Sequence, residues 1–381
     1  MFSVSVVMIM AALLMIFRGE SDAAGRAFAI LSYSRMQLTF TSPSALRVIH
    51  IGGYWRGLND VVRQMMLGLC STGAAVLEYN TDDQLQALDT EGRAYDRGTF
   101  GPVWLREEHL QPVIDEFRPD LIVCNAGGLS FRPAHALELR KRICLIGIAL
   151  SDPDVFELAT SKIAANFDAY LTNSDAMIPQ FRALGVNVHQ WPPATYEGFY
   201  RPLPAKPEYR CEVLIFGNGY PDRVSPARAL LQRFHTHVYG ELWGDYGISS
   251  RGLVFGEESV HILSSACITV VFCKTSGGHP IIKPYLFDYP AGGALVATNY
   301  LPIVERYFIY GKELIGFEST GELIEKVRYY LDHPEQAEQI RAAGRARVLQ
   351  EHTWQHVWPR IFRLAEQPAG SFTSPLFSQA K

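Results

Sequence analysis

The feature that most constrains the fold of this chain is a repeated alternation of short apolar segments with stretches predicted to be helical. In the first half, apolar segments occur at residues 46–51, 74–79, 120–124, 143–148 and 169–171. Strands that are apolar on both faces are typical of a parallel sheet covered by helices on both sides. The segment 46–194 is therefore predicted to form one Rossmann-like domain.

A proline-rich crossing separates this block from a second block with the same alternation. The crossing runs from Trp191 to Pro207 and contains five prolines, so we place the linker at 195–210. The second alternation begins at Cys211–Phe216 and extends over 211–352. The predicted fold class is therefore α/β, with two Rossmann-like domains.

The C-terminal end is predicted to add one amphipathic helix at 353–367 and a disordered tail at 368–381. In the helix, apolar side chains recur at i, i+3, i+4, i+7 and i+10, which forms one face. These residues are Trp354, Val357, Trp358, Ile361 and Leu364.

Composition excludes several classes of protein. A length of 381 residues is too great for one compact core and suits two domains. The formal net charge of −4 argues against a nucleic-acid duplex as the main partner. The six cysteines form neither a CxxC pair nor a Cys/His cluster, so neither a disulfide framework nor a zinc site is predicted.

Residues 1–45 are interpreted as an N-terminal extension. The first 17 residues are apolar, but they are fewer than the roughly 20 of a bilayer span and lack the basic region of a secretory signal. One interpretation is a membrane anchor or signal. The other, which we favour, is an extension upstream of the true start, for example at Met36. A cytoplasmic protein is then expected, with peripheral membrane contact as the alternative.

A glycine loop in the second block is the first candidate phosphate site. Gly217, Asn218 and Gly219 follow a predicted strand, and Arg223 lies just before a helix predicted from Ser225. This geometry directs backbone N–H groups and a helix N-terminus at phosphate, and the arginine can pair with phosphate oxygens. The alternative is an ordinary strand-to-helix turn with a solvated arginine.

A second candidate segment runs from Lys283 to Glu305. Asp288 precedes the Gly292-Gly293 turn, where a carboxylate can accept hydrogen bonds from a ribose diol and glycines allow a diphosphate to approach the backbone. Lys283 is a candidate cation at the phosphates, ahead of Lys274 in the same region. For Glu305 the alternative is stabilisation of a helix N-terminus.

The N-terminal domain offers weaker candidates at predicted strand ends. Gly52 and Gly53 form a glycine turn that continues through Tyr54 to Gly57. Asp152 and Asp154 are candidate bases for an acceptor hydroxyl, although both positions suit helix caps equally well.

Several of these motifs together resemble a known family. The loop GNGYP at 217–221, the segment KPYLFDYPAGGALVAT at 283–298, Asp332-His333-Pro334-Glu335 and Glu351-His352-Thr353 are similar to the spore maturation protein CgeB-like glycosyltransferases (group 1, family 4-like), which have the GT-B architecture. The family typically has Glu where this chain has Asp288, and a glutamate where this chain has Pro280.

The resemblance implies a nucleotide-sugar donor, UDP- or GDP-linked, and no further cofactor or metal. Gly52 and Gly53 would face the donor diphosphate and the acceptor, and Tyr239, in a Y-G-x-x-W motif, would lie near the base. The last helix would cross back onto the N-terminal domain. The acceptor is a glycan, a lipid-linked sugar or a protein. The alternatives are a catalytically inactive nucleotide- or sugar-binding coat protein and a GT-B nucleotide-sugar epimerase.

Overall fold

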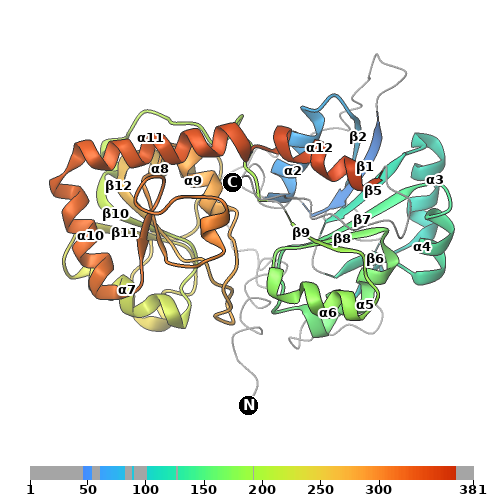
Figure 1. The fold of residues 1–381 in the computed structure, drawn as a ribbon, viewed down its shortest axis with the longest axis horizontal. Coiled ribbons are helices and arrows are strands. Elements are labelled where there is room, and N and C mark those ends of the chain that lie inside the picture. Colours follow the sequence, from blue (N-terminus) through green and yellow to red (C-terminus); the bar gives the residue numbers. More distant parts are fainter. Residues whose placement is uncertain are drawn as a thin grey trace, which may run out of the picture. The chain divides into compact units, whose positions relative to one another are not determined.

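The computed structural model describes residues 46–53, 61–81, 88–89, 101–125, 128–191 and 193–365. The chain forms two compact units (Figure 1). The first contains residues 1–53 and 73–189, and the second contains residues 54–72 and 190–381. The extension predicted at 1–45 and the tail predicted at 368–381 lie outside the described residues.

The first unit is built on a six-stranded sheet with the order β2-β1-β5-β7-β8-β9. The first five of these strands pair in parallel with their neighbours, as the apolar segments predicted. The strands are β1 (Arg47–Gly52), β2 (Ala75–Asn80), β5 (Leu121–Asn125), β7 (Cys144–Ala149), β8 (Ala169–Thr172) and β9 (Val188–Gln190).

The helices of this unit follow the predicted alternation, with two differences. The helices are α3 (Glu107–Phe117), α4 (Pro133–Leu139), α5 (Ser161–Ile163) and α6 (Ile178–Ala183), with a π-helix at Phe156–Thr160 and 3₁₀ turns at Ala164–Asn166 and Asp175–Met177. The helical stretch expected between the apolar segments 143–148 and 169–171 is therefore broken into short pieces. A small sheet of β3 (Leu88–Asp89), β4 (Val103–Leu105) and β6 (Leu129–Phe131) was not predicted, because its strands are too short to give a periodic signal.

The second unit contains a five-stranded parallel sheet with the order β11-β10-β12-β13-β14. The strands are β10 (Cys211–Phe216), β11 (Thr236–Tyr239), β12 (Ala266–Val271), β13 (Val296–Asn299) and β14 (Ile315–Phe317). The fold class predicted from the sequence, α/β with two Rossmann-like domains, is confirmed.

Helices surround this second sheet (Figure 1). They are α7 (Pro221–Leu231), α8 (Glu257–Ser265), α9 (Tyr285–Ala291), α10 (Thr320–Asp332) and α11 (Pro334–Glu351), with 3₁₀ turns at Pro207–Tyr209, Gly244–Tyr246 and Val304–Arg306. The last helix, α12 (Trp354–Ala365), follows α11 and does not cover this sheet. Helix α11 opens at Pro334 and has His333 at its N-cap position, and Asp332 is the last residue of α10.

The last helix packs against α2 (Val61–Cys70), which joins β1 to β2 in the sequence. The indole Nε1 of Trp358 donates to the Met65 carbonyl at 2.8 Å. A Cβ added at Gly68 would lie 2.0 Å from the Cβ of Trp354, so only glycine permits this approach. Trp354, Val357, Trp358 and Ile361 are buried as predicted, and the side chain of Leu364 lies outside the described part. Through α2, a segment of the first half of the sequence belongs to the second unit.

No helix in the described part of the chain has both the length and the apolar character needed to cross a membrane.

Candidate functional site

The candidate site lies where the chain order in the second sheet reverses. From β10 the chain continues to β11 on one side, while β12 pairs on the other side of β10. In open parallel sheets, ligands bind at such a switch point, beside the carboxyl ends of the strands. Gly217 follows β10 and Lys274 lies in the loop after β12, so both lie at this edge.

The glycines after β10 and β11 allow two loops to lie in contact. Gly217 has φ +144° and Gly240 has φ +122°. A Cβ added at Gly240 would lie 2.3 Å from the Gly217 carbonyl oxygen. The indole of Trp243, which is fully buried, donates to the same carbonyl at 2.8 Å. Trp243 is therefore part of the core and fixes the loop.

The backbone N–H groups of this loop are partly engaged within the protein. The Gly217 N–H donates to the Tyr239 carbonyl at 3.0 Å, and the Gly219 N–H donates to the Glu241 carbonyl at 2.8 Å. The Asn218 side-chain oxygen accepts from the Glu241 N–H at 3.0 Å. These two glycine N–H groups, which the sequence interpretation directed at phosphate, hold the loop to the residues that follow β11.

Arg223 is a buried cation at the switch point. Helix α7 begins at Pro221, four residues before the predicted start, so Arg223 lies in its first turn. Its Nη1 donates to the Asn218 carbonyl at 2.8 Å and its Nη2 to the Lys274 carbonyl at 3.3 Å. Its guanidinium carbon lies 4.5 Å from the Tyr220 ring centroid.

The charge of Arg223 is incompletely compensated. The side chain is 7% exposed, and its buried Nε makes no hydrogen bond. Burial lowers the pKa of Arg223, while Tyr220 and Asp222 act to raise it. Among the described residues, the Arg223 side chain donates to carbonyl oxygens and lies over aromatic rings, and no carboxylate forms an ion pair with it. Its charge is offset only at longer range by Asp222, and such a buried charge favours an anion nearby.

The second predicted cation, Lys283, lies near the same place. Burial raises the pKa of the Cys273 thiol, and Lys283 and Arg223 both act to lower it. Both cations therefore influence one buried thiol just beyond the end of β12. Lys274 is half-buried, whereas His279 is exposed in the loop that follows.

A pocket with aromatic walls adjoins the glycine loop. Its volume is about 70 Å³, and Gly217 and Asn218 contribute to its lining. Tyr285 and Tyr289 stand one helical turn apart on α9, with ring centroids 5.2 Å apart and an interplanar angle of 17°. Tyr289 in turn stacks on Phe216 at 5.9 Å. Flat rings in this arrangement suit a planar ligand group.

The described structure does not bring Asp288 to this pocket. Asp288 lies between Tyr285 and Tyr289 in the sequence of α9, but its side chain is only 2% exposed and does not line the pocket. Burial raises the pKa of Asp288 well above its usual range, while the Thr195 hydroxyl acts to lower it. The carboxyl group therefore lies in the protein interior on the side of Thr195.

The two glycines predicted in this segment lie at the opposite edge of the sheet from the loop at Gly217. Gly292 and Gly293 terminate α9 and precede β13, so they lie at its amino end, whereas the glycine loop follows the carboxyl end of β10. Gly293 has φ +87°, and a Cβ added there would lie 3.1 Å from Pro202. Glu305 follows β13 and accepts a hydrogen bond from the Tyr300 hydroxyl. Tyr239 is buried beside Phe216, with ring centroids 5.6 Å apart.

In the first unit, Gly52 lies at the corresponding switch point between β1 and β5. Gly52 pairs in register with Asn125, and Gly53 follows directly. The continuation of this loop, Tyr54 to Gly57, lies outside the described residues.

Asp152, a candidate base, is engaged in internal contacts. It is fully buried, and its two oxygens accept from the Thr160 and Thr172 hydroxyls, each at 2.7 Å. Burial raises its pKa, and both hydroxyls act to lower it. The π-helix that follows has its N-cap at Val155 with no side-chain cap, so Asp152 ties this segment to β8 and does not cap the helix.

Comparison with known proteins begins with the sequence. Residues 197–363 match the family described as glycosyl transferase-like. This segment covers most of the second unit. Among curated proteins, none matches the sequence significantly.

Solved structures define the fold. A sucrose-phosphate synthase from Thermosynechococcus elongatus superposes with a TM-score of 0.58 at 15% identity, covering 84% of this chain and 98% of that chain. Anabaena HepE in complex with UDP and glucose gives 0.53 at 10% identity, covering 84% and 99%. AviGT4, a glycosyltransferase of avilamycin A biosynthesis, gives 0.53 at 15% identity, covering 84% and 97%. The chain has the fold of GT-B glycosyltransferases.

The aromatic residues of the pocket in this GT-B fold were missed in the sequence. Tyr285 and Tyr289 are spaced i, i+4, so a helix start at Tyr285 puts both on one face. Asp288, the acidic residue between them, was predicted to contact the ribose, although its side chain points away from the pocket. Phe216, the last residue of β10, is distinguished by no local signal.

Proposed function

We propose that the protein is a glycosyltransferase that moves a sugar from a nucleotide-sugar donor to an acceptor hydroxyl. The observation that carries the proposal is the buried, incompletely compensated charge of Arg223 beside the glycine loop at the switch point of the second sheet. A donor diphosphate is the anion that such a charge suits in a protein with this fold. The match of residues 197–363 to the glycosyl transferase-like family supports the same conclusion.

The aromatic pocket is our candidate for the nucleotide base. The paired rings of Tyr285 and Tyr289 would stack on the base, while the loop at Gly217 and Asn218 borders the same cavity. Because the cavity is small, at about 70 Å³, a pyrimidine is preferred over a purine, which makes UDP the first donor to test ahead of GDP. HepE, one of the structures with this fold, was solved with UDP and glucose.

Arg223 and Lys283 would stabilise the leaving diphosphate without a metal ion. Negative charge grows on the diphosphate as the glycosidic bond breaks, and fixed cations are most effective where the charge develops. Both side chains act on the Cys273 thiol, which supports a shared location. The ribose contact predicted for Asp288 requires its carboxyl group to leave the interior, and we treat it as a separate hypothesis.

We also propose, from the motifs shared with CgeB-like enzymes, that the protein is a glycosyltransferase of that kind. The acceptor is then a glycan, a lipid-linked sugar or a protein. One alternative is a protein that binds the nucleotide sugar without transferring it.

One experiment separates the two candidates. Binding of UDP and GDP is measured by calorimetry, and release of nucleotide is measured with a panel of UDP- and GDP-sugars. We expect binding and slow nucleotide release by hydrolysis or transfer. Saturable binding with no release from any donor would favour the binding protein, and the absence of binding would refute both.

A further inference from the structure

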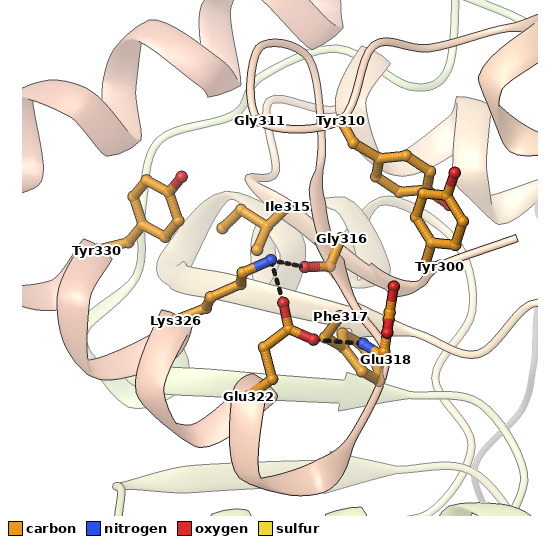
Figure 2. Close-up of a pocket in the computed structure, with 10 residues that line it drawn as sticks. All are labelled: Tyr300, Tyr310, Gly311, Ile315, Gly316, Phe317, Glu318, Glu322, Lys326 and Tyr330. Atoms are coloured by element: carbon orange, nitrogen blue, oxygen red, sulfur yellow. Dashed lines mark hydrogen bonds and ion pairs between the residues drawn. The ribbon is translucent and has the colours of Figure 1, made fainter.

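A second pocket lies along β14, the strand at the edge of the second sheet, away from the switch point. Its volume is about 240 Å³. This is somewhat below the roughly 300–1,000 Å³ of sites for drug-sized ligands, so the pocket suits a small ring. Three tyrosines and three charged residues are among those that line it (Figure 2): Tyr300, Tyr310, Tyr330, Glu318, Glu322 and Lys326.

Aromatic rings form the walls of this pocket. Tyr300 and Tyr310 lie on one side with ring centroids 5.0 Å apart, and Tyr330 lies across from them (Figure 2). The Tyr310 hydroxyl accepts from the Leu301 N–H at 3.1 Å and donates to the Asn299 carbonyl at 3.2 Å. These two hydrogen bonds fix its ring, whereas Tyr300 is 39% exposed and offers its ring to a ligand.

The floor of the pocket depends on a glycine in the edge strand. A Cβ added at Gly316 would lie 2.6 Å from the Tyr310 ring, so only glycine lets this ring approach the strand. The Lys326 ammonium donates to the Gly316 carbonyl at 2.5 Å. This contact satisfies an edge carbonyl that would otherwise be free to pair with another strand.

The charges of the pocket favour a ligand that donates hydrogen bonds. The Lys326 ammonium also pairs with Glu322 at 2.6 Å, so its charge is already compensated. The other Glu322 oxygen accepts from the Glu318 N–H at 2.7 Å. The Glu318 residue is exposed, and its carboxylate extends beside Tyr300 (Figure 2). The three charged groups sum to one negative charge, which disfavours an anion.

We propose that this pocket binds one neutral saccharide residue. A sugar ring presents C–H groups on its flat face, which pack on tyrosine rings, and hydroxyl groups on its rim, which donate to carboxylates. Tyr300 and Tyr330 would contact the ring faces, and Glu318 would accept from the hydroxyl groups. The site would hold a part of a glycan that is remote from the reacting end.

The test measures sugar binding in the absence of nucleotide. The probes are methyl glucoside, N-acetylglucosamine and maltotriose as neutral sugars, glucuronic acid as an anion and spermidine as a cation. Binding to the full chain is followed by calorimetry and by NMR of ring-labelled tyrosine. We expect at least one neutral sugar to bind and to shift the Tyr300 and Tyr330 signals, while glucuronic acid binds more weakly.

Matched variants connect the binding to this pocket. Tyr300→Ala and Glu318→Ala should each weaken the binding about tenfold, the change expected from the loss of one interaction of about 1.4 kcal/mol. The controls are Tyr246→Ala and Glu325→Ala, which alter residues of the same types outside the pocket and should leave the affinity unchanged.

Two outcomes would overturn the proposal: no neutral sugar binds, whether or not spermidine does, or the two pocket variants bind as tightly as the controls. If a variant is unstable, the shifts of the Tyr300 and Tyr330 signals in the unmodified protein still show whether a sugar binds in this pocket. Because no donor is present, these outcomes are independent of whether nucleotide sugars are turned over.

Discussion

The guanidinium of Arg223 lies over the ring of Tyr220, 4.5 Å from its centroid, on the first turn of α7. The ring covers one face of the cation, and carbonyl oxygens meet its edge. This arrangement keeps the charge in one position within the interior, which is what stabilisation of a developing negative charge requires.

Replacement of Arg223 by alanine is expected to lower turnover more than it raises the donor KM, because the leaving-group charge grows toward the transition state. The loss should be about 2.7–4 kcal/mol, or two to three decades in kcat. Single-turnover kinetics at saturating donor measure it. Arg228→Ala, an exposed arginine of the same helix, is the control, and Lys283→Ala is measured in parallel.

Lys283 is the competing candidate for this role. If Arg223→Ala keeps near-normal turnover while Lys283→Ala abolishes it, the lysine carries the charge. Full activity in both variants would place the phosphate site elsewhere. Thermal melting must accompany the kinetics, because Arg223→Ala also leaves the Asn218 and Lys274 carbonyls without these donors.

Replacement of Tyr285 by alanine is expected to weaken UDP binding by one to two decades, since stacking of a base on an aromatic ring contributes about 1–3 kcal/mol. Titration calorimetry with UDP gives the affinity. Tyr246→Ala, an equally half-buried tyrosine outside the pocket, should bind UDP as the wild type does. Equal losses in both variants would contradict the assignment of the pocket.

The interior position of Asp288 predicts an effect on stability. Its pKa is raised in the folded state, so the folded protein binds the proton more tightly and loses stability as the pH rises above about 3.9. Asp288→Asn removes this dependence. The difference in unfolding free energy, Asp288→Asn minus wild type, should therefore increase from pH 4.5 to pH 8, as measured by urea denaturation.

Nucleotide affinity of the same variant tests the ribose hypothesis. With the carboxyl group in the interior, Asp288→Asn and Asp288→Ala should bind UDP within twofold of wild type. A loss of one to two decades in Asp288→Ala, the effect of removing about 1.5–3 kcal/mol of hydrogen bonding, would instead show that the carboxylate contacts the ribose.

His352 predicts a pH dependence of the opposite sign. Burial lowers its pKa from 6.5 to about 3, so the unfolded chain binds a proton that the folded protein does not. Stability is therefore complete above pH 6.5 and falls below it, by about 2 kcal/mol at pH 5. His352→Phe, which keeps a ring beside Phe287 and Phe308, should lack this fall in urea denaturation. An unchanged slope would exclude His352 as its source.

Because α2 packs closely against α12, we expect that Gly68 does not tolerate an added methyl group. Gly68→Ala should lower the unfolding free energy by about 1–3 kcal/mol, because the added Cβ overlaps the Trp354 side chain. Gly321→Ala, in α10 with no atom nearer than 3.8 Å, should be neutral or stabilise by about 0.5–1 kcal/mol. Chemical denaturation of both variants provides the comparison, and equal stability would contradict the packing.

Most strands of the two sheets could be predicted from the sequence because they are short apolar runs with a turn on either side. Strand β9, which contains His189 and Gln190, was not predicted. The strand Cys211–Phe216 was predicted with its observed bounds. The start of α7 was placed too late, although Pro221 at its first position is a recognisable signal.

The site was harder to predict because it depends on the direction of side chains. In α9 a carboxyl group and two tyrosines lie within five residues, and only the position of the helix on the sheet decides which of them enters the pocket. Likewise, the glycine loop could be found from Gly217 and Gly219. Their N–H groups donate to the carbonyls of Tyr239 and Glu241, and these hydrogen bonds could not be predicted because they depend on a neighbouring strand.

The hydrogen bond between Trp358 and Met65 also has a consequence for biosynthesis. The two residues are 293 positions apart, so at about 5–20 residues per second the ribosome makes α12 roughly 15–60 s after α2. During this interval the face of α2 at Met65 and Gly68 has no partner helix. The second unit can be completed only after translation has passed Trp358, and nascent chains that stall earlier would present this surface to chaperones.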